Sequence, residues 1–325
     1  AVYLADLNEA PFNLVSVSVL SVLENQPSGS LVGEFNATDQ DANSSLTYEL
    51  ASGAGGEANG LFFLDVNGTL KTAALFDFEN NASSYAIRVR VRDEHNISIE
   101  GIFTVNLLDL NEVPFDLVSV SVLSVAENQT VGSMVGEFNA TDQDANSSLT
   151  YELVSGEGDS GNGLFSLESN GTLRTAEILN YESNVSRVIR VRVKDEYNAS
   201  VEGVFSVNLT DLNEAPVNLV AVSSLNVAEN QPSGSLVGEF NATDQDANAT
   251  LTYELVSGAG DADNGLFALD ANGTLKTATI FDFESNASTY SVRVRAKDEH
   301  NASVESMLAV YLADLNEAPF NLVSV

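Results

Sequence analysis

Acidic side chains recur in a fixed order along this 325-residue chain. The order is an isolated Glu in ENQ, two Asp in DQDAN, a further pair in FDFE, an Asp in DEH or DEY, and finally DLNE. Carboxylates placed this close together repel one another unless a cation lies between them. Calcium takes six to eight oxygen ligands, including backbone carbonyls, in adaptable geometry. The acidic motifs therefore predict calcium sites.

The composition excludes several other kinds of site. The chain has 47 acidic residues against 13 basic ones, a formal net charge of -34, and no cysteine. Nucleic acid and anionic membrane surfaces are disfavoured as partners because both require basic residues. The lack of cysteine excludes disulfides, thiolate zinc sites and cysteine nucleophiles. A hydrophobic content of 44% still supports folded cores.

The chain consists of three copies of one unit. The string DLNE begins at Asp6, Asp109, Asp211 and Asp314, with spacings of 103, 102 and 103 residues. The opening AVYLADLNEAPFNLVSV recurs unchanged at residues 309–325, which suggests a fragment excised from a longer array. We predict repeats at residues 10–112, 113–214 and 215–317, with 1–9 ending a preceding repeat and 318–325 starting a following one.

Each copy is expected to be all-β. Apolar and polar residues alternate in LVSVSVLSV, SLTYEL, IRVRVRD and IFTVNL, as in half-buried strands. The dipeptide Asn67-Gly68 and its counterparts Asn170-Gly171 and Asn272-Gly273 predict a hairpin in each copy. About seven strands in about 100 residues predict an antiparallel, immunoglobulin-like β-sandwich.

The ordered motifs ENQ, DQD, N-x-x-L-T-Y, FDFE, DE and DLNEAP resemble the cadherin repeat, in its bacterial cadherin-like form. The resemblance covers the whole chain three times. It implies Greek-key β-sandwiches in an extended array, with several calcium ions bound at each junction between repeats.

The resemblance also implies the ligands. At the first junction they are Glu24, Asp77, Glu79, Asp109, Asn111, Glu112, Asp142, Asp144, Asp195 and Asn146, with the carbonyls of Leu110 and Asn146 as candidates. At the second they are Glu127, Glu182, Asp211, Asn213, Glu214, Asp244, Asp246, Asp298 and Asn248. Half-sites at the two ends comprise Asp6, Asn8, Glu9, Asp39, Asp41 and Asp93, and Glu229, Asp282, Glu284, Asp314, Asn316 and Glu317.

Three departures from the family pattern affect these sites. The linker DLNEAP is one residue shorter than the animal DxNDNAP pattern, and the Asp-x-Asp loop is also short. Asn180 replaces the first acid of the D-x-E pair in copy two. We therefore expect the second junction to bind calcium more weakly or to hold fewer ions.

Asn-x-Ser/Thr sequons form a second pattern, with five equivalent positions per copy and an acidic residue two positions before each. The acid-extended form resembles the acceptor of bacterial N-linked oligosaccharyltransferases; the alternative is that turn composition and calcium acids produce it by themselves. The candidate glycosylation sites are Asn36, Asn43, Asn67, Asn81, Asn96, Asn139, Asn146, Asn170, Asn184, Asn198, Asn241, Asn248, Asn272, Asn286 and Asn301. Two further sequons, at Asn128 and Asn208, lack the acid.

Basic residues alternate along one predicted strand per copy, as in Arg88, Arg90 and Arg92. We favour a solvated face paired with acids on a neighbouring strand over a stripe that docks on another acidic molecule.

The sequence offers no constellation typical of an enzyme, because His95 and His300 lie in a predicted turn and no phosphate-binding loop is present. We expect an extracellular, cell-surface adhesin stalk, with neighbouring repeats and other copies of the chain as partners and without membrane insertion. The alternatives are a self-assembling filament and, less favoured, a calcium-dependent carbohydrate-binding module.

Overall fold

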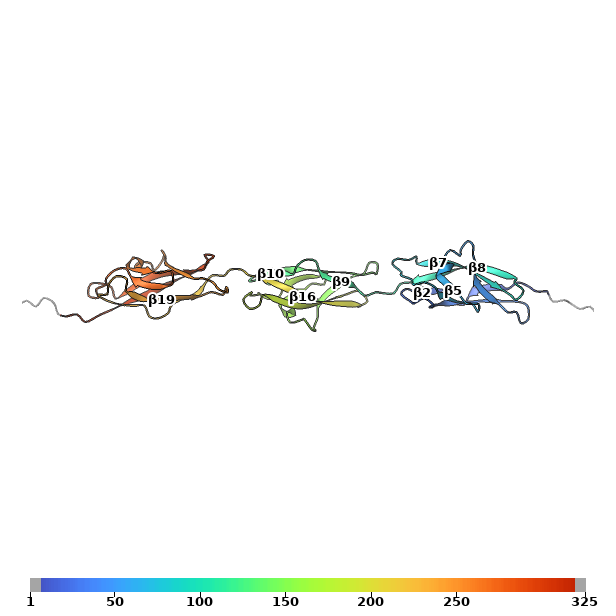
Figure 1. The fold of residues 1–325 in the computed structure, drawn as a ribbon, viewed down its shortest axis with the longest axis horizontal. Helices are drawn as coiled ribbons and strands as arrows, with labels where there is room; N and C mark the ends of the chain where they lie inside the picture. Colours follow the sequence, from blue (N-terminus) through green and yellow to red (C-terminus); the bar gives the residue numbers. More distant parts are fainter. Residues whose placement is uncertain (1–6, 319–325) are drawn as a thin grey trace, which may run out of the picture.

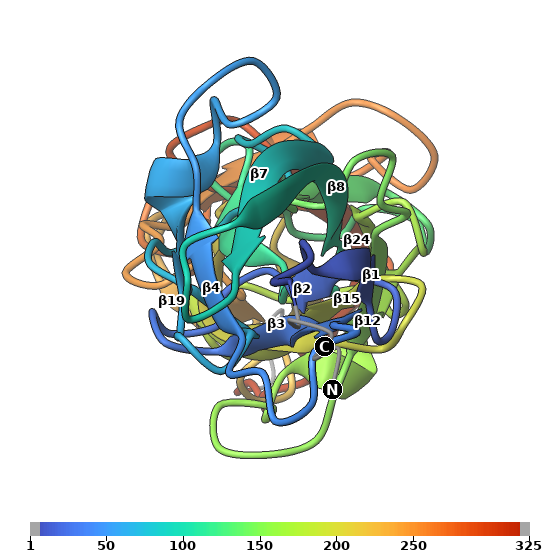
Figure 2. The same ribbon diagram turned by 90° about the vertical axis from the view of Figure 1, so that its right-hand side faces the viewer.

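A computed structural model describes residues 7–318 as three β-sandwiches joined end to end (Figure 1). Viewed along the long axis, the three sandwiches overlap around one common line (Figure 2). The architecture confirms the predicted all-β array of three immunoglobulin-like sandwiches.

The three repeats contain the same elements in the same order. Repeat 1 has β1 (Phe12–Ser16), β2 (Ser21–Leu23), β3 (Leu31–Thr38), β4 (Thr47–Leu50), η1 (Asn59–Leu61), β5 (Phe62–Leu64), β6 (Thr69–Thr72), β7 (Ser84–Arg92) and β8 (Ser98–Leu108). Repeat 2 has β9 (Phe115–Ser119), β10 (Ser124–Ala126), β11 (Met134–Thr141), β12 (Thr150–Leu153), η2 (Asn162–Leu164), β13 (Phe165–Leu167), β14 (Thr172–Thr175), β15 (Ser186–Lys194) and β16 (Ser200–Thr210). Repeat 3 has β17 (Val217–Ala221), β18 (Asn226–Ala228), β19 (Leu236–Thr243), β20 (Thr252–Leu255), η3 (Asn264–Leu266), β21 (Phe267–Leu269), β22 (Thr274–Thr277), β23 (Thr289–Lys297) and β24 (Ser303–Ala313).

Two four-stranded sheets form each sandwich, ordered β1-β3-β6-β5 and β2-β8-β7-β4 in repeat 1. The run LVSVSVLSV is not one strand: β1 pairs with β3, residues 17–20 cross over, and β2 joins the opposite sheet. There β2 lies parallel to β8, so each repeat has eight strands and one parallel pair where we predicted about seven antiparallel strands. The crossover inserts Leu20, which is 3% exposed, between the sheets.

The predicted alternation places one face of each strand in the core. Ile87, Val89 and Val91 of β7 are fully buried, while the arginines between them point outward. Phe62, Phe76 and Tyr85 pack together at centroid distances of 5.3 to 6.1 Å. Each repeat thus buries its own apolar cluster.

The predicted Asn-Gly hairpin is present between β5 and β6. Its loop spans residues 65–68, with the Asp65 N–H bonded to the Thr69 carbonyl at 2.9 Å. Gly68 has a φ of +95°, and a Cβ there would lie 2.6 Å from the Phe35 carbonyl oxygen. Both features require glycine at this position.

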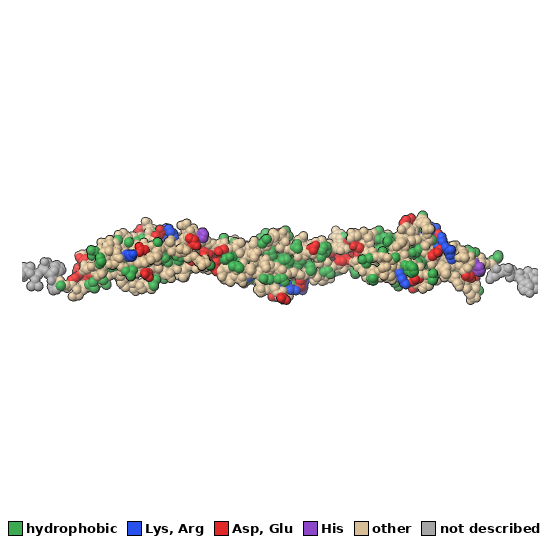
Figure 3. Space-filling model, viewed as in Figure 1, with side chains coloured by type: hydrophobic (Ala, Val, Ile, Leu, Met, Phe, Trp, Pro, Cys, Tyr) green, Lys and Arg blue, Asp and Glu red, His purple; other side chains and the backbone are tan. Residues whose placement is uncertain are grey.

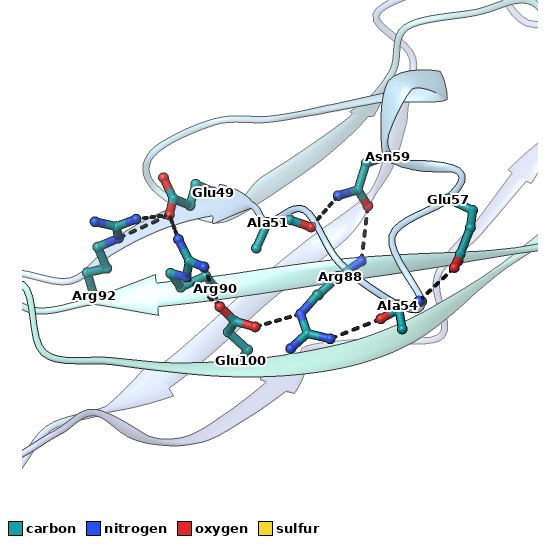
Figure 4. Close-up of polar contacts among 10 residues, drawn as sticks. Glu49, Ala51, Ala54, Glu57, Asn59, Arg88, Arg90, Arg92 and Glu100 are labelled. Carbon is teal, nitrogen blue, oxygen red and sulfur yellow. Dashed lines mark hydrogen bonds and ion pairs between the residues drawn. The ribbon is translucent and has the colours of Figure 1, made fainter.

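The basic residues of β7 are paired with acids, as favoured from the sequence (Figure 4). Glu100 on β8 bonds both Arg88 and Arg90, and Glu49 on β4 bonds Arg90 and Arg92. We call this row of alternating ion pairs the Arg–Glu ladder, and the other two repeats contain it as well. Its acids are Glu202 and Glu152 in repeat 2, and Glu305 and Glu254 in repeat 3. All nine alternating basic residues of β7, β15 and β23 form these ion pairs, so in the described residues they leave no free basic stripe on this face.

Candidate metal sites at the repeat junctions

A fully buried glutamate stands at the end of each repeat that faces the following linker. Glu24, directly after β2, is 0% exposed, and its carboxylate accepts backbone N–H bonds from Phe78 at 2.7 Å and Leu110 at 2.8 Å. It therefore fixes the FDFE loop and the linker to the same point. Glu127 and Glu229 make the same pairs of bonds in the other repeats.

At the first junction, carboxylates from both repeats converge. Glu24, Asp77 and Glu79 each place an oxygen within 4.8 Å of the others, and Glu79 forms a second such group with Asp109 and Asp144. Glu79 belongs to both groups, which makes one continuous acidic site across the junction, or seam, between the two repeats. In Figure 3 acidic side chains gather where neighbouring sandwiches meet.

The second junction repeats this arrangement with one acid fewer. Its two groups are Glu127, Glu182 and Asp211, and Glu182, Glu214 and Asp246. Asn180, the counterpart of Asp77, keeps the local turn because its side-chain oxygen accepts the Ser183 N–H at 2.7 Å. It contributes no carboxylate.

Each linker is also attached to the repeat that follows it. The Asn111 amide donates to Asp195 at 2.9 Å, and the Glu112 N–H donates to Asp144 at 3.0 Å. Asn213 and Glu214 bond Asp298 and Asp246 in the same way, at 2.8 and 3.0 Å. Hydrogen bonds from linker amides and backbone N–H groups outweigh the cost of burial and lower the pKa of Asp298.

Several buried carboxylate oxygens at the two junctions and at the N-terminal half-site lack any hydrogen-bond partner. They belong to Asp39, Glu79, Glu112, Asp142, Glu214, Asp244 and Asp246. All seven residues are predicted calcium ligands, and the set includes no residue from elsewhere in the described chain. Buried polar atoms are rarely left unpaired, because each carries a full desolvation cost. This donor set of closely spaced, unpaired oxygens fits a hard cation.

Burial and mutual repulsion raise the pKa of several acids at the two junctions. Burial and the Glu24 carboxylate raise the pKa of Glu112 to about 7, and burial with Glu127 raises the pKa of Glu214 to about 7. Burial, followed by neighbouring carboxylates, likewise raises the pKa of Asp144, Glu182 and Asp211. Protons and a cation would therefore compete for the same carboxylate oxygens.

The raised pKa values predict that calcium affinity depends on pH. Calcium needs the ionised form of Glu112 and Glu214, so binding must release the proton that each carries below pH 7. A group of pKa about 7 is about 90% ionised at pH 8 and about 10% at pH 6, so affinity should fall about tenfold per junction over that range. Calorimetric calcium titrations at pH 6, 7 and 8 measure this. Equal affinities at all three would contradict the prediction, and Glu112→Gln with Glu214→Gln should flatten the dependence.

The terminal half-sites reproduce parts of the same geometry. Asn8 donates to Asp93 at 2.7 Å, the Glu9 N–H donates to Asp41 at 3.0 Å, and the Asp41 N–H donates to the Asp39 carboxylate at 2.9 Å. Asp6 lies outside the described residues. At the other end Glu229, Asp282 and Glu284 form one group, and the Glu229 and Asp314 carboxylates contribute to raising the pKa of Glu284. Asn316 is exposed.

The two asparagines that follow the Asp-x-Asp pairs, Asn146 and Asn248, are exposed, with φ of +66° and +68°. Their role as ligands stays a prediction. Asp142 and Asp244 accept the N–H of Asp144 and Asp246, at 3.0 and 3.1 Å, which holds each pair in one conformation.

One set of seam residues was not among the predicted ligands. Asn25, Asn128 and Asn230 have φ near +60°, and their amides donate to the linker glutamates Glu112, Glu214 and Glu317. The recurring string ENQ carried this signal, because its Asn always follows the buried glutamate. Each such Asn orients one oxygen of a linker glutamate.

Tandem β-sandwiches with acidic seams define a class of extended repeat protein. The model of the Cadherin domain family matches residues 18–108, 121–210 and 223–312, so the chain belongs to the cadherin domain family, with three tandem repeats. Human Protocadherin-23 is 31% identical over 312 residues, which cover 90% of this chain and 9% of that protein. Mouse Cadherin EGF LAG seven-pass G-type receptor 1 is 30% identical over 345 residues, covering 98% of this chain and 11% of that protein.

Solved structures share the fold. Mouse Cadherin-23 EC22-24 aligns with a TM-score of 0.66 at 24% identity, covering 93% of this chain and 97% of that chain. The cis-dimer structure of Protocadherin gammaB7 EC3-6 gives a TM-score of 0.68 at 22% identity, covering 93% and 73%. The chain spans about a tenth of the length of the two curated relatives. The two curated relatives are human and mouse proteins, and Cadherin-23 EC22-24 is a mouse protein. The comparisons therefore do not support the bacterial form that the sequence pattern suggested.

Proposed function

We propose that each junction binds calcium and that the bound ions stiffen the array. The observation that carries the proposal is the set of buried, unpaired carboxylate oxygens, which in the described residues lie at the two junctions and, for Asp39, at the N-terminal half-site. Calcium would supply the missing partner for these oxygens and compensate the charge that raises the pKa of Glu112 and Glu214.

The ligands come from three segments of the chain: one repeat, the linker, and the next repeat. Glu24, Asp77 and Glu79 belong to one repeat, Asp109 and Glu112 to the linker, and Asp142 and Asp144 to the next repeat. In the second junction the corresponding residues are Glu127 and Glu182, Asp211 and Glu214, and Asp244 and Asp246. A cation bound to all three segments resists bending at the linker, whereas their mutual repulsion without it favours bending.

We infer from the family that the array serves as an extracellular, non-enzymatic spacer in a cell-adhesion protein, with neighbouring repeats as its main contacts. Such repeats bury their own cores and touch chiefly their neighbours, so an array projects a distal element without new packing. In the described part of the chain, no helix combines the length and hydrophobicity needed to span a membrane.

Small-angle X-ray scattering with calcium and with EGTA tests the proposal. We expect the calcium form to have the larger maximum dimension and a narrower distance distribution, because the linkers become rigid. Magnesium at the same concentration is the matched control, since it binds poorly to such all-protein carboxylate sites. Identical scattering in calcium and EGTA would overturn the proposal.

A further inference from the structure

In repeats 1 and 3, the loop that carries the acidic pair begins on three packed aromatic side chains. In repeat 1 the central one is Phe76, which is 2% exposed and directly precedes Asp77. Phe76 packs against Phe62 at a centroid distance of 5.6 Å and against Tyr85 at 5.3 Å. We call these three residues the aromatic trio. Because the loop is attached to the core through this trio, the trio holds Asp77 and Glu79 at the linker end of the repeat.

Repeat 3 contains the same trio, whereas repeat 2 does not. In repeat 3 its members, packed at centroid distances of 4.9 to 6.0 Å, are Phe267, Phe281 and Tyr290. The corresponding residues of repeat 2 are Phe165, Leu179 and Arg187, so only one of the three rings remains. Edge-to-face and offset ring pairs stabilise a core beyond the area that they bury. The linker end of repeat 2 therefore lacks packing that the other two repeats have.

Arg187 occupies an inward-facing position of strand β15. The strand alternates, and Ile189 and Val191 are fully buried on the same side. Burial of an unpaired guanidinium is costly. The Arg187 guanidinium instead donates to the backbone carbonyls of Asn184 and Ser186, at 2.9 and 3.1 Å, and Arg187 remains partly exposed. A core position that holds a tyrosine in the other repeats is thus given to a side chain that bonds back to the loop.

A third difference lies close to the buried glutamate of repeat 2. Three residues after this glutamate, repeats 1 and 3 have Pro27 and Pro232, and repeat 2 has Thr130. The turn itself is unchanged. The N–H of Ser133 bonds the Thr130 carbonyl at 3.1 Å, and Pro27 accepts the same bond in repeat 1 at 3.2 Å. A proline that fits the native backbone stabilises the fold by restricting the unfolded chain. Repeat 2 lacks this restriction at the same end.

The loop of repeat 2 between β14 and β15, residues 176–185, carries contacts on which the second junction depends. The Tyr181 N–H donates to the buried Glu127 carboxylate at 2.8 Å, and Glu182 belongs to both acidic groups of the junction. If the loop opens, Glu182 leaves the junction. Glu127 then keeps only one of its two N–H donors, that of Leu212 in the linker.

We propose that residues 176–185 open locally about 100-fold more often than the equivalent loops, residues 73–83 and 278–288, and that this opening makes the second junction the hinge of the array. The sheet of repeat 2 stays folded, because β15 keeps the same pairing with β12 and β16 as in the other repeats. Bending follows from the loss of one of the two bonds through which Glu127 joins the repeat to the linker. The opening itself requires no calcium; only the statement that calcium closes the loop through Glu182 rests on the proposed function.

Hydrogen exchange of the three-repeat chain in EGTA, resolved to single amides, tests the opening. The N–H groups of Tyr181, Phe78 and Phe283 are equivalent reporters, because each donates to the buried glutamate of its repeat at 2.7 to 2.8 Å. We expect a protection factor about 100-fold lower for Tyr181 than for the other two. Equal protection of the three would overturn the proposal. Protection lowered equally along the β15–β16 ladder would also overturn it, since the whole repeat would then unfold.

Exchange of the trio between repeats assigns the cause. Leu179→Phe combined with Arg187→Tyr should raise the protection of the Tyr181 N–H about 100-fold, and Phe76→Leu combined with Tyr85→Arg should lower that of the Phe78 N–H by a similar factor. Ile178→Ala is the matched control, because Ile178 lies in the same loop but is 64% exposed. It should change neither value. Unaltered protection in the variant with the restored trio would contradict the role given to the rings, even if the reciprocal variant failed to fold.

Spin labels measure the hinge directly, since the chain contains no cysteine. Thr104, Ser206 and Ala309 are exposed at equivalent positions of β8, β16 and β24. Labels on Thr104→Cys with Ser206→Cys span the first junction, and labels on Ser206→Cys with Ala309→Cys span the second. In EGTA, pulsed electron paramagnetic resonance should give a broader distance distribution across the second junction.

The variant with the restored trio should narrow the second distribution to the width of the first. Equal widths in the wild type, or an unchanged width in this variant, would overturn the hinge. Both measurements are made without calcium, so they stand or fall separately from the scattering experiment on calcium stiffening.

Discussion

Replacing Glu24 by glutamine is expected to weaken calcium binding at the first junction about 100-fold, the largest effect of a single substitution in this chain. The wild-type carboxylate is fully buried, accepts two backbone N–H groups, and lies within 4.8 Å of the Asp77 and Glu79 oxygens. Glutamine offers one acceptor oxygen, so its NH₂ group must face one of the two backbone donors. The variant loses a negative charge and leaves a buried N–H unpaired.

The same substitution should also destabilise the calcium-free first repeat. A hydrogen bond to a charged group contributes about 1.5 to 3 kcal/mol, so losing one and weakening the other costs about 3 kcal/mol. Urea unfolding in EGTA measures the loss in free energy of unfolding, and calorimetric titration measures the loss of calcium affinity. Glu177→Gln, which removes the same charge from an exposed position in repeat 2, should change neither. Native calcium affinity in Glu24→Gln would contradict the assignment of Glu24 to the site.

The second large effect is an exchange of affinity between the two junctions. Asn180→Asp should raise calcium affinity at the second junction about tenfold, and Asp77→Asn should lower it at the first by a similar factor, because one carboxylate is gained or lost beside the ion. The exchange is nearly isosteric. Asp77 accepts the Asn80 N–H at 2.9 Å and Asn180 accepts the Ser183 N–H at 2.7 Å, so either residue holds the same turn.

The double variant is the sharpest form of this experiment. With Asp77→Asn and Asn180→Asp combined, the total charge is unchanged and the order of the two affinities should reverse. Two-site fits to calcium titrations give the affinity of each junction in the wild type, both single variants and the double variant. Ser183→Ala, which touches the turn without changing charge, should leave the order unchanged. An Asn180→Asp protein with unaltered affinity would contradict the role given to the missing acid.

The seams were predictable from sequence because their chemistry is local and repeated. The Asp-x-Asp pair, the FDFE pair and the linker occur in one order three times, so a single copy serves as a template for the others. The arginine ladder was only half predictable: period-two alternation put Arg88, Arg90 and Arg92 on one face, but their partners Glu49 and Glu100 lie on two other strands. Their identity depends on the pairing register, which the sequence of one strand does not contain.

The split of the first strand was not predictable from alternation. Apolar residues continue with period two through LVSVSVLSV, so nothing in the pattern marks the crossover between the sheets. The decisive contact is the burial of Leu20 between the sheets, which depends on both sheets being present. The buried position of Glu24 was missed as a structural feature for the same reason, since its two N–H donors are 54 and 86 residues away.

The parallel pairing of β2 with β8 determines how a repeat responds to tension. β2 lies near the start of the repeat and β8 leads directly into the next linker, so a pull on the two ends draws these strands in opposite directions along their length. The register from Ser21–Asn106 to Leu23–Leu108, extended by the bond from the Glu24 N–H to the Leu108 carbonyl, is then loaded in shear. Hydrogen bonds loaded in shear share the force and break together, whereas a ladder pulled apart from one end breaks bond by bond. Each sandwich therefore carries a mechanical clamp along the line of the array, immediately beside the glutamate that anchors the linker.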